Sequence, residues 1–378
     1  MAQDPWLLTP GPLTTSMTVK EAMLHDWGSR DASFIRMNSE MRTKLVGLIA
    51  GEGAFTTVPM QGSGTFAVEA MLATFVGPTD KLLILINGAY GKRMAKICDY
   101  AKRSHVSLEW AEDQPVNPQQ VAEALAKDTA ITHVAVVQCE TTSGVLNPVA
   151  EVAAVVAKAG RRLLIDAMSA FGALPLDSRT IPFDAVAASS NKCIEGVPGL
   201  GFVLCRESAL VGCKGNAHAL VLDLYDQWQV IEATKQYRFT PPIHCIAAFH
   251  QALVEHAAEG GVAGRGARYR ANCKILIDGM RALGFETLLP DHLQAPIIVT
   301  FHMPADPKFN FQLFYDKLRD RNYVIYPGKL TVADSFRIGC IGRLDAAEMT
   351  GALAAVKAVM AELGVASGSP KKLAASAE

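Results

Sequence analysis

One lysine in the middle of the chain, Lys192, lies between small residues and a segment rich in glycine and proline, in ASSNKCIEGVPGLGF. The apolar run before it, FDAVAAS, predicts a buried strand, and the glycines after it predict a tight turn. An amine held where the dielectric is low has its neutral form favoured, which makes it a nucleophile toward carbonyl carbon. The alternative is a lysine that reaches solvent or pairs with Asp184 or Glu195.

A second candidate, Asp166, ends another apolar run, RRLLID. A carboxylate at the end of a buried strand is costly unless a positive or protonated group faces it. The position therefore predicts a partner for a cation, and the alternative is a residue that caps the following turn.

A third candidate is the segment QGSGT, which joins the predicted strand AFTTVPM to the predicted helix TFAVEAMLATFV. Ser63, Gly64 and Thr65 would present backbone N–H groups and two hydroxyls at the positive end of that helix, which suits a phosphate. The segment is neither a P-loop nor a dinucleotide fingerprint. The alternative is a glycine turn with a capping hydroxyl.

These three features together are what pyridoxal phosphate requires. The helix start anchors its phosphate, Lys192 forms a Schiff base with its aldehyde, and Asp166 keeps its pyridine nitrogen protonated. The ring can then accept electrons from a carbanion, and the released lysine can move the proton.

The elements that must position these residues alternate between strands and helices. Strands rich in Val, Ile and Leu, interleaved with helices, predict an α/β fold with a largely parallel sheet covered on both faces, which places ligands at the carboxyl ends of its strands. After about residue 262 the pattern becomes α+β and predicts a smaller second domain. We expect an N-terminal segment over 1–16, a large domain over 17–262, a small domain over 263–365 and a flexible tail over 366–378.

The composition narrows the class of partner. Of 378 residues 50% are hydrophobic and 19% charged, with a formal net charge of -1, so we expect neither nucleic acid nor a membrane as partner. The N-terminus has no basic region followed by an apolar run, which favours a cytoplasmic protein. The eight cysteines form no C-x-x-C pair and the nine histidines no H-E-x-x-H motif, so we expect reduced thiols and no metal.

A set of segments along the chain resembles the class V aminotransferases of fold-type I. The likeness extends from Leu7 to Gly339 and implies a mostly parallel seven-stranded sheet flanked by helices, plus a smaller α+β C-terminal domain. The segments are DWGSRD, QGSGT, NGAYG, ETTSG, DAMSAFG, SSNKCIEGVPG, LDLYDQW, YRFTPP, YPGK and FRIG.

The resemblance assigns a role to each candidate site residue. Lys192 and Asp166 are catalytic, Tyr90 and Met168 pack on the two faces of the cofactor ring, and Thr141 meets the ring hydroxyl. The alternative for Tyr90 is a core aromatic. The implied residues for pyridoxal 5'-phosphate are Ser63, Gly64, Thr65, Tyr90, Thr141, Asp166, Met168, Asn191, Lys192, Tyr237 and Thr240.

The resemblance also implies a homodimer, in which Tyr237 and Thr240 reach the phosphate of the neighbouring subunit's cofactor. In the resemblance, Arg337 binds the substrate anion, because its planar guanidinium suits carboxylate and phosphonate oxygens alike. Arg30 could face a phosphonate. The alternatives are a plain helix entry for Tyr237 and Thr240, an inter-strand residue for Arg337 and a surface ion pair for Arg30.

The activity implied by the resemblance is a two-stage transamination in phosphonate degradation. The amino group of 2-aminoethylphosphonate passes to pyruvate, giving phosphonoacetaldehyde and L-alanine. The alternatives are an alanine or serine transaminase that uses glyoxylate and, in a different class, a non-catalytic phosphate- or nucleotide-binding protein. The chain departs from the family pattern at Glu195, where glutamine is usual, and at Cys340, where asparagine is usual.

Overall fold

The computed structural model describes residues 4–328, 330 and 333–370. The chain forms two compact units. The larger unit comprises Thr15–Glu140 and Leu146–Gly266, and the smaller one comprises Thr141–Val145 with the described residues of 1–14 and 267–378. The domain limits expected from the sequence stay a prediction, and the expected tail lies from residue 371 onward outside the described residues.

The larger unit is built on a seven-stranded sheet with the order β2-β10-β9-β8-β5-β3-β4. Every neighbouring pair from β9 to β4 is parallel, while β10 runs antiparallel to both β2 and β9. The predicted α/β fold with a mostly parallel sheet is therefore confirmed. The strands are β2 (Phe55–Gln61), β3 (Lys81–Ile86), β4 (Ser104–Glu109), β5 (His133–Val137), β8 (Arg162–Asp166), β9 (Ala185–Ser189) and β10 (Leu200–Arg206).

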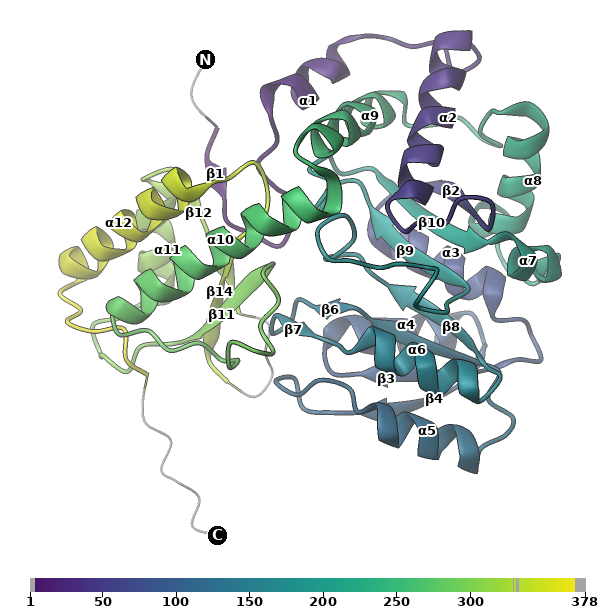
Figure 1. Ribbon diagram of the computed structural model, residues 1–378. Coiled ribbons are helices and arrows are strands. Elements are labelled where there is room, and N and C mark those ends of the chain that lie inside the picture. Colours follow the sequence, from purple (N-terminus) through teal and green to yellow (C-terminus); the bar gives the residue numbers. More distant parts are fainter. Residues whose placement is uncertain (1–3, 329, 331–332, 371–378) are drawn as a thin grey trace. The chain divides into compact units, whose positions relative to one another are not determined.

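Side chains that alternate along the strands fill two separate cores, one on each face of the sheet. Val134, Val136 and Ile165 belong to one core, and Ala135 and Leu164 belong to the other. Both faces are covered, which explains why the strands are continuously apolar. The first core also takes residues of α2 (Ala32–Gly47), α5 (Pro118–Lys127), α6 (Val149–Lys158) and α9 (Ile243–Ala258), and the second those of α3 (Gly64–Phe75), α4 (Ala89–Tyr100) and α8 (Leu224–Thr234) (Figure 1).

β4 forms one edge of the sheet. Its sequence, SHVSLE, has only partly buried and exposed positions, unlike the buried runs of the central strands. Positions that stay partly exposed do not need apolar residues. This is why its signal in the sequence is weaker.

The smaller unit contains a three-stranded antiparallel sheet, β11-β14-β13, and the parallel pair β1 and β12. Its helix α12 begins with a capping box formed by Asp345 and Glu348. The elements are β1 (Trp6–Leu7), β11 (Ile298–His302), β12 (Tyr323–Val324), β13 (Tyr326–Pro327), β14 (Ser335–Gly339), α11 (Phe311–Arg319), α12 (Ala346–Leu363) and most of α10 (Gly261–Ala282). No helix among the described residues is both long and apolar enough to cross a membrane.

Candidate active site

One pocket of about 160 Å³ in the larger unit gathers most of the predicted site residues. It lies at the carboxyl ends of β8 and β9 and at the first turn of α3, where an open parallel sheet places its ligands. The predicted residues that line it are Ser63, Gly64, Thr65, Tyr90, Asp166, Met168, Asn191 and Lys192.

Strand order brings the carboxylate and the amine to this pocket. β8 and β9 are parallel neighbours, and Asp166 at the end of β8 is paired in register with Ala187 of β9. The chain leaves β9 at Ser189 and reaches Lys192 within one short loop. Adjacent parallel strands therefore carry the two groups to the same edge of the sheet.

Asp166 is 4% exposed, and its electrostatic surroundings disfavour the charged form. Burial raises the pKa of this carboxyl to about 6, although the N–H of Met168 donates to Oδ1 at 2.9 Å and lowers it in part. The charge of Glu140 adds to the rise, and those of Arg93 and Lys192 oppose it. A cation placed against Asp166 would relieve this cost.

Lys192 lines the same pocket, and burial lowers the pKa of its amine to about 8. The nearby thiol Cys193 and the carboxylate of Asp166 oppose the lowering, and the charge of Arg93 adds to it. The suggested alternative partner Glu195 instead forms an ion pair with Arg265, at 3.4 Å. A considerable fraction of the Lys192 amine is thus neutral near pH 8, as a nucleophile requires.

The first turn of α3 forms one wall of the pocket. Ser63 is the N-cap, yet its side chain makes no capping hydrogen bond. Gly64 allows a close approach, because a Cβ there would lie 2.2 Å from Sδ of Met168. The Ser63 side chain thus leaves the N–H groups at the helix start uncapped, and next to them the Thr65 hydroxyl accepts from Arg93 Nη1 at 3.2 Å.

Two charged residues of this region, Arg93 and Glu140, were not predicted. Arg93 lines the pocket from α4, and in the sequence it is one cation among several in GKRMAKICDYAKR. Glu140 is fully buried and accepts from the N–H of Tyr90 at 3.1 Å. A Cβ at Gly88 would lie 2.3 Å from Cδ of Glu140, so glycine at that position admits the carboxylate. The only sequence signal for Glu140 was its place beside Thr141 in ETTSG.

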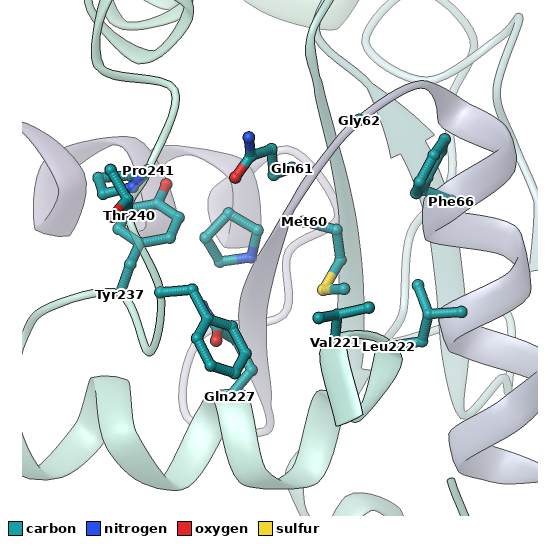
Figure 2. Close-up of a pocket in the computed structure, with 12 residues that line it drawn as sticks. Met60, Gln61, Gly62, Phe66, Val221, Leu222, Gln227, Tyr237, Thr240 and Pro241 are labelled. Atoms are coloured by element: carbon teal, nitrogen blue, oxygen red, sulfur yellow. The ribbon is translucent and has the colours of Figure 1, made fainter. Parts of the chain in front are cut away.

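Arg30, Tyr237 and Thr240 do not line the Lys192 pocket but line a second pocket together. Tyr237 and Thr240 also line an apolar pocket of about 390 Å³. Figure 2 shows Tyr237 and Thr240 on one side of that pocket and Phe66 on the other. The buried Tyr237 hydroxyl has no hydrogen-bond partner among the described residues, and burial raises its pKa.

The remaining predicted residues, Thr141 and Arg337, meet in the smaller unit. Arg337 is 2% exposed and donates from Nη1 to the carbonyl oxygen of Thr141 at 2.6 Å. Its Nε donates to the carbonyl of Pro327 at 3.1 Å, and Cζ lies 5.0 Å from the centroid of the Tyr326 ring. The Thr141 hydroxyl is buried and has no partner among the residues that the structure describes.

Comparison with known proteins identifies the family. The family model described as aminotransferase class-V matches residues 19–327, which is most of the chain. The chain belongs to the class V aminotransferases. The family resemblance seen in the sequence motifs is thereby confirmed.

Relatives of this aminotransferase match it over nearly its whole length. It is 51% identical over 368 residues to 2-aminoethylphosphonate–pyruvate transaminase 1 of Polaromonas sp., an alignment that covers 97% of this chain and 98% of that protein. It is also 51% identical to the 2-aminoethylphosphonate–pyruvate transaminase of Pseudomonas fluorescens, over 96% of this chain and 98% of that one.

Solved structures of other aminotransferases share the fold at lower identity. Pyridoxamine–pyruvate aminotransferase from Mesorhizobium loti matches with a TM-score of 0.87 and 24% identity, over 97% of this chain and 95% of that one. Alanine–glyoxylate aminotransferase from Nostoc sp. matches with a TM-score of 0.88 and 22% identity, over 95% and 96% of the two chains. At these identities the likeness supports the fold alone.

The sequence departs from the family pattern at Cys340 and Glu195. Cys340 lies in the core of the smaller unit and has no exposed surface. A hydrogen bond with Cys273, together with burial, raises the pKa of its thiol. Cys340 is therefore a neutral core residue, and Glu195 belongs to the loop that follows Lys192.

Proposed function

We propose that this aminotransferase uses pyridoxal 5'-phosphate to transfer the amino group of 2-aminoethylphosphonate to pyruvate, releasing phosphonoacetaldehyde and L-alanine. The observation that carries the proposal is the shared pocket of Asp166 and Lys192, whose pKa values are shifted toward each other, to about 6 and about 8. The substrates follow from the names of relatives that are 51% identical over almost the full chain.

The residues of the pocket fit the cofactor chemically. The start of α3 offers a phosphate its backbone N–H groups and the Ser63 hydroxyl, which makes no capping hydrogen bond. The positive charge of Arg93 lies beside Thr65. At another wall, the costly buried carboxylate of Asp166 suits a protonated ring nitrogen. Tyr90 and Met168 are the apolar surfaces available to the two faces of a flat ring.

Pyridoxal phosphate, when bound, supplies an aldehyde that condenses with amines and a ring that takes up the electron pair of a broken C–H bond. The chain supplies the proton transfers. Nζ of Lys192 would accept the proton from the substrate carbon that carries the amino group. A lowered pKa suits this task, because the amine is then a base near pH 8 and can still return the proton.

Asp166 and Glu140 have separate tasks in the proposal. Asp166 holds the proton on the ring nitrogen, since a buried carboxylate favours a cation opposite it. Glu140 accepts from the backbone of Tyr90 and thereby fixes the first turn of α4, from which Tyr90 and Arg93 reach the pocket. The positions of Tyr90 and Arg93 in the pocket thus depend on the carboxylate of Glu140, which does not itself line the pocket.

Arg337 is the residue proposed to bind the anionic end of each substrate. A guanidinium binds carboxylate and phosphonate oxygens with two parallel hydrogen bonds, so one residue can serve both halves of the reaction. Its hydrogen bonds to the carbonyls of Thr141 and Pro327 support this role, because they fix the plane of the guanidinium before a substrate binds. The Thr141 hydroxyl is proposed to meet the ring hydroxyl of the cofactor.

We also propose that the active form is a homodimer in which each copy completes the other's site. The support is the apolar pocket of Figure 2, lined by Tyr237, whose hydroxyl has no hydrogen-bond partner among the described residues. Large apolar side chains stay exposed beside it, among them Phe66 at 51% and Val221 at 61%. Arg30 shares its surface pocket with Tyr237 and Thr240, which is the basis for proposing that all three serve the neighbouring copy.

The test is a visible absorption spectrum of the purified protein, followed through both half-reactions. We expect a coloured protein that bleaches with 2-aminoethylphosphonate and recovers with pyruvate. A Lys192→Ala variant should lose turnover and the visible band. Faster turnover of serine or alanine with glyoxylate would support the alternative transaminase, and a colourless protein that binds nucleotides would overturn the enzymatic assignment.

A further inference from the structure

Arg265, which the proposed mechanism does not use, is 1% exposed, although it carries a permanent charge. It lies in the first turns of α10 (Gly261–Ala282). Two carboxylates face its guanidinium. Oε2 of Glu259 lies 2.7 Å from Nε, and Oε1 of Glu195 lies 3.4 Å from Nη1. A buried guanidinium paired on two sides has a fixed orientation.

The same guanidinium also binds the backbone beside Lys192. Nη1 of Arg265 donates a short hydrogen bond to the carbonyl oxygen of Cys193, the residue directly after Lys192. Arginine offers several donors in a rigid fork, so one side chain can hold a carbonyl and two carboxylates at once. The contact joins the start of α10 to the loop that carries the amine.

The loop itself is tightly folded. The N–H of Glu195 donates to the carbonyl of Lys192 at 2.7 Å, and Sγ of Cys193 donates to the carbonyl of Ser169 at 3.0 Å. Glu195 has a φ of 64°, in the left-handed region that a residue with a side chain rarely adopts. Such a conformation persists only where the surroundings impose it, and the ion pair with Arg265 is one such constraint.

We propose that Arg265 is a positioning residue for Lys192. Held between Glu195 and Glu259, it fixes the carbonyl of Cys193 and so keeps the amine of Lys192 at its place in the pocket. The inference rests on the proposed role of Lys192 as the amine that reacts with pyridoxal phosphate. It adds a residue that acts on the reaction without touching cofactor or substrate.

The experiment measures how fast Lys192 itself reacts, without any turnover. The full-length protein, freed of cofactor, is mixed with pyridoxal phosphate for increasing times and then treated with borohydride. Mass spectrometry of the digest gives the labelling rate of Lys192 relative to the exposed Lys214 in the same sample. Arg265→Lys is compared with Arg268→Lys, a matched change three residues further along α10.

Arg268 is a suitable control because it also holds carbonyl groups, those of Gly342 and Leu344, at 2.6 and 2.8 Å. We expect Arg265→Lys to slow the labelling of Lys192 by about 10- to 100-fold, as small misplacements of reacting groups do. Arg268→Lys should label Lys192 at the wild-type rate. Equal rates for wild type and Arg265→Lys, or an equal loss in both variants, would overturn the inference.

Two further outcomes keep the inference separate from folding and from the proposed function. If Arg265→Lys does not fold, Glu259→Gln replaces it, since Glu259 stands at the more exposed end of the ion cluster, with 21% of its side chain exposed. That variant should slow labelling in the same direction by a smaller factor, and a wild-type rate would count against the inference. If wild-type Lys192 is labelled no faster than Lys214, the proposed function itself fails.

Discussion

The guanidinium of Arg93 lies over the ring of Tyr90, with 5.0 Å between Cζ and the ring centroid. Both residues come from α4 and both line the pocket of Lys192. Arg93 therefore brings a positive charge beside the ring against which the cofactor is proposed to stack. Its charge acts on the two titrating groups of the site, since it lowers the pKa of both Asp166 and Lys192.

Removal of that charge should move the pH profile of the reaction. In Arg93→Gln we expect the pKa of Lys192, which burial lowers and the charge of Arg93 lowers further, to rise. Less neutral amine at a given pH means slower turnover, by roughly threefold to tenfold at pH 7, since such a charge interaction is worth on the order of 1 kcal/mol. The measurement is the rate from pH 6 to 10. The control is Lys96→Gln, which removes an exposed charge of the same helix, and identical profiles for the two variants would contradict the expectation.

Replacement of the buried carboxylate should stabilise the protein when no cofactor is bound. Burial raises the pKa of Asp166 from 3.8 to about 6, so the folded state binds its proton more tightly than the unfolded state does. The loss of folding stability caused by burying the charged carboxylate is absent below pH 3.8 and complete above pH 6. Asp166→Asn, freed of cofactor, should therefore exceed wild type at pH 8 by about 2–3 kcal/mol in free energy of unfolding. Urea unfolding measures the margin, and a margin that does not shrink from pH 8 to pH 5 would refute the assigned cause.

A methyl group at residue 64 should weaken cofactor binding more than folding. In Gly64→Ala the Cβ would lie 2.2 Å from Sδ of Met168, so that this side chain, which lines the pocket, must shift. We expect a loss of about 1 kcal/mol in unfolding free energy, typical of mild overpacking, and a clear loss of affinity for pyridoxal phosphate. Gly212→Ala, where a Cβ meets no atom within 4 Å, is the matched control. Unchanged affinity in Gly64→Ala would show that Met168 has room to move elsewhere.

The substrate role proposed for Arg337 predicts a loss that both substrates share. Arg337→Lys keeps the charge and loses the planar fork, so KM should rise about 10- to 100-fold for 2-aminoethylphosphonate and for pyruvate, the equivalent of one or two hydrogen bonds to a charged group. Steady-state kinetics with each substrate varied in turn measures both constants. A rise confined to one substrate would limit Arg337 to one half of the reaction.

Many single elements could be predicted from the sequence because their signals are local. The apolar runs LLILI, HVAVV and RLLID each form strands of the central sheet, and each is buried on both faces, so no polar residue interrupts the run. β4 lacked that signal because none of its residues is fully buried. The likeness of the motifs to the class V family carried the same information over the whole chain.

The candidate site could be predicted only in part. Asp166 ends a strand, and Ser63 and Lys192 come shortly after one, which marks all three in the sequence. Arg93 and Glu140 carry no such mark, because a charged residue in an amphipathic helix or beside a threonine is usually unremarkable. The resemblance already assigned Tyr237 and Thr240 to the neighbouring subunit's site, but no pattern predicted that Arg30 shares a pocket with them.

By itself, the sequence determined which residues end strands and which begin helices, because backbone preferences and apolar periodicity act over a few neighbours. The tertiary structure decided that β8 lies beside β9 and that α3 begins at the same edge of the sheet. That order depends on strand pairing between residues far apart in the chain, as between Asp166 and Ala187. Because the shifted pKa values of Asp166 and Lys192 arise mainly from burial, they too exist only once the chain has folded.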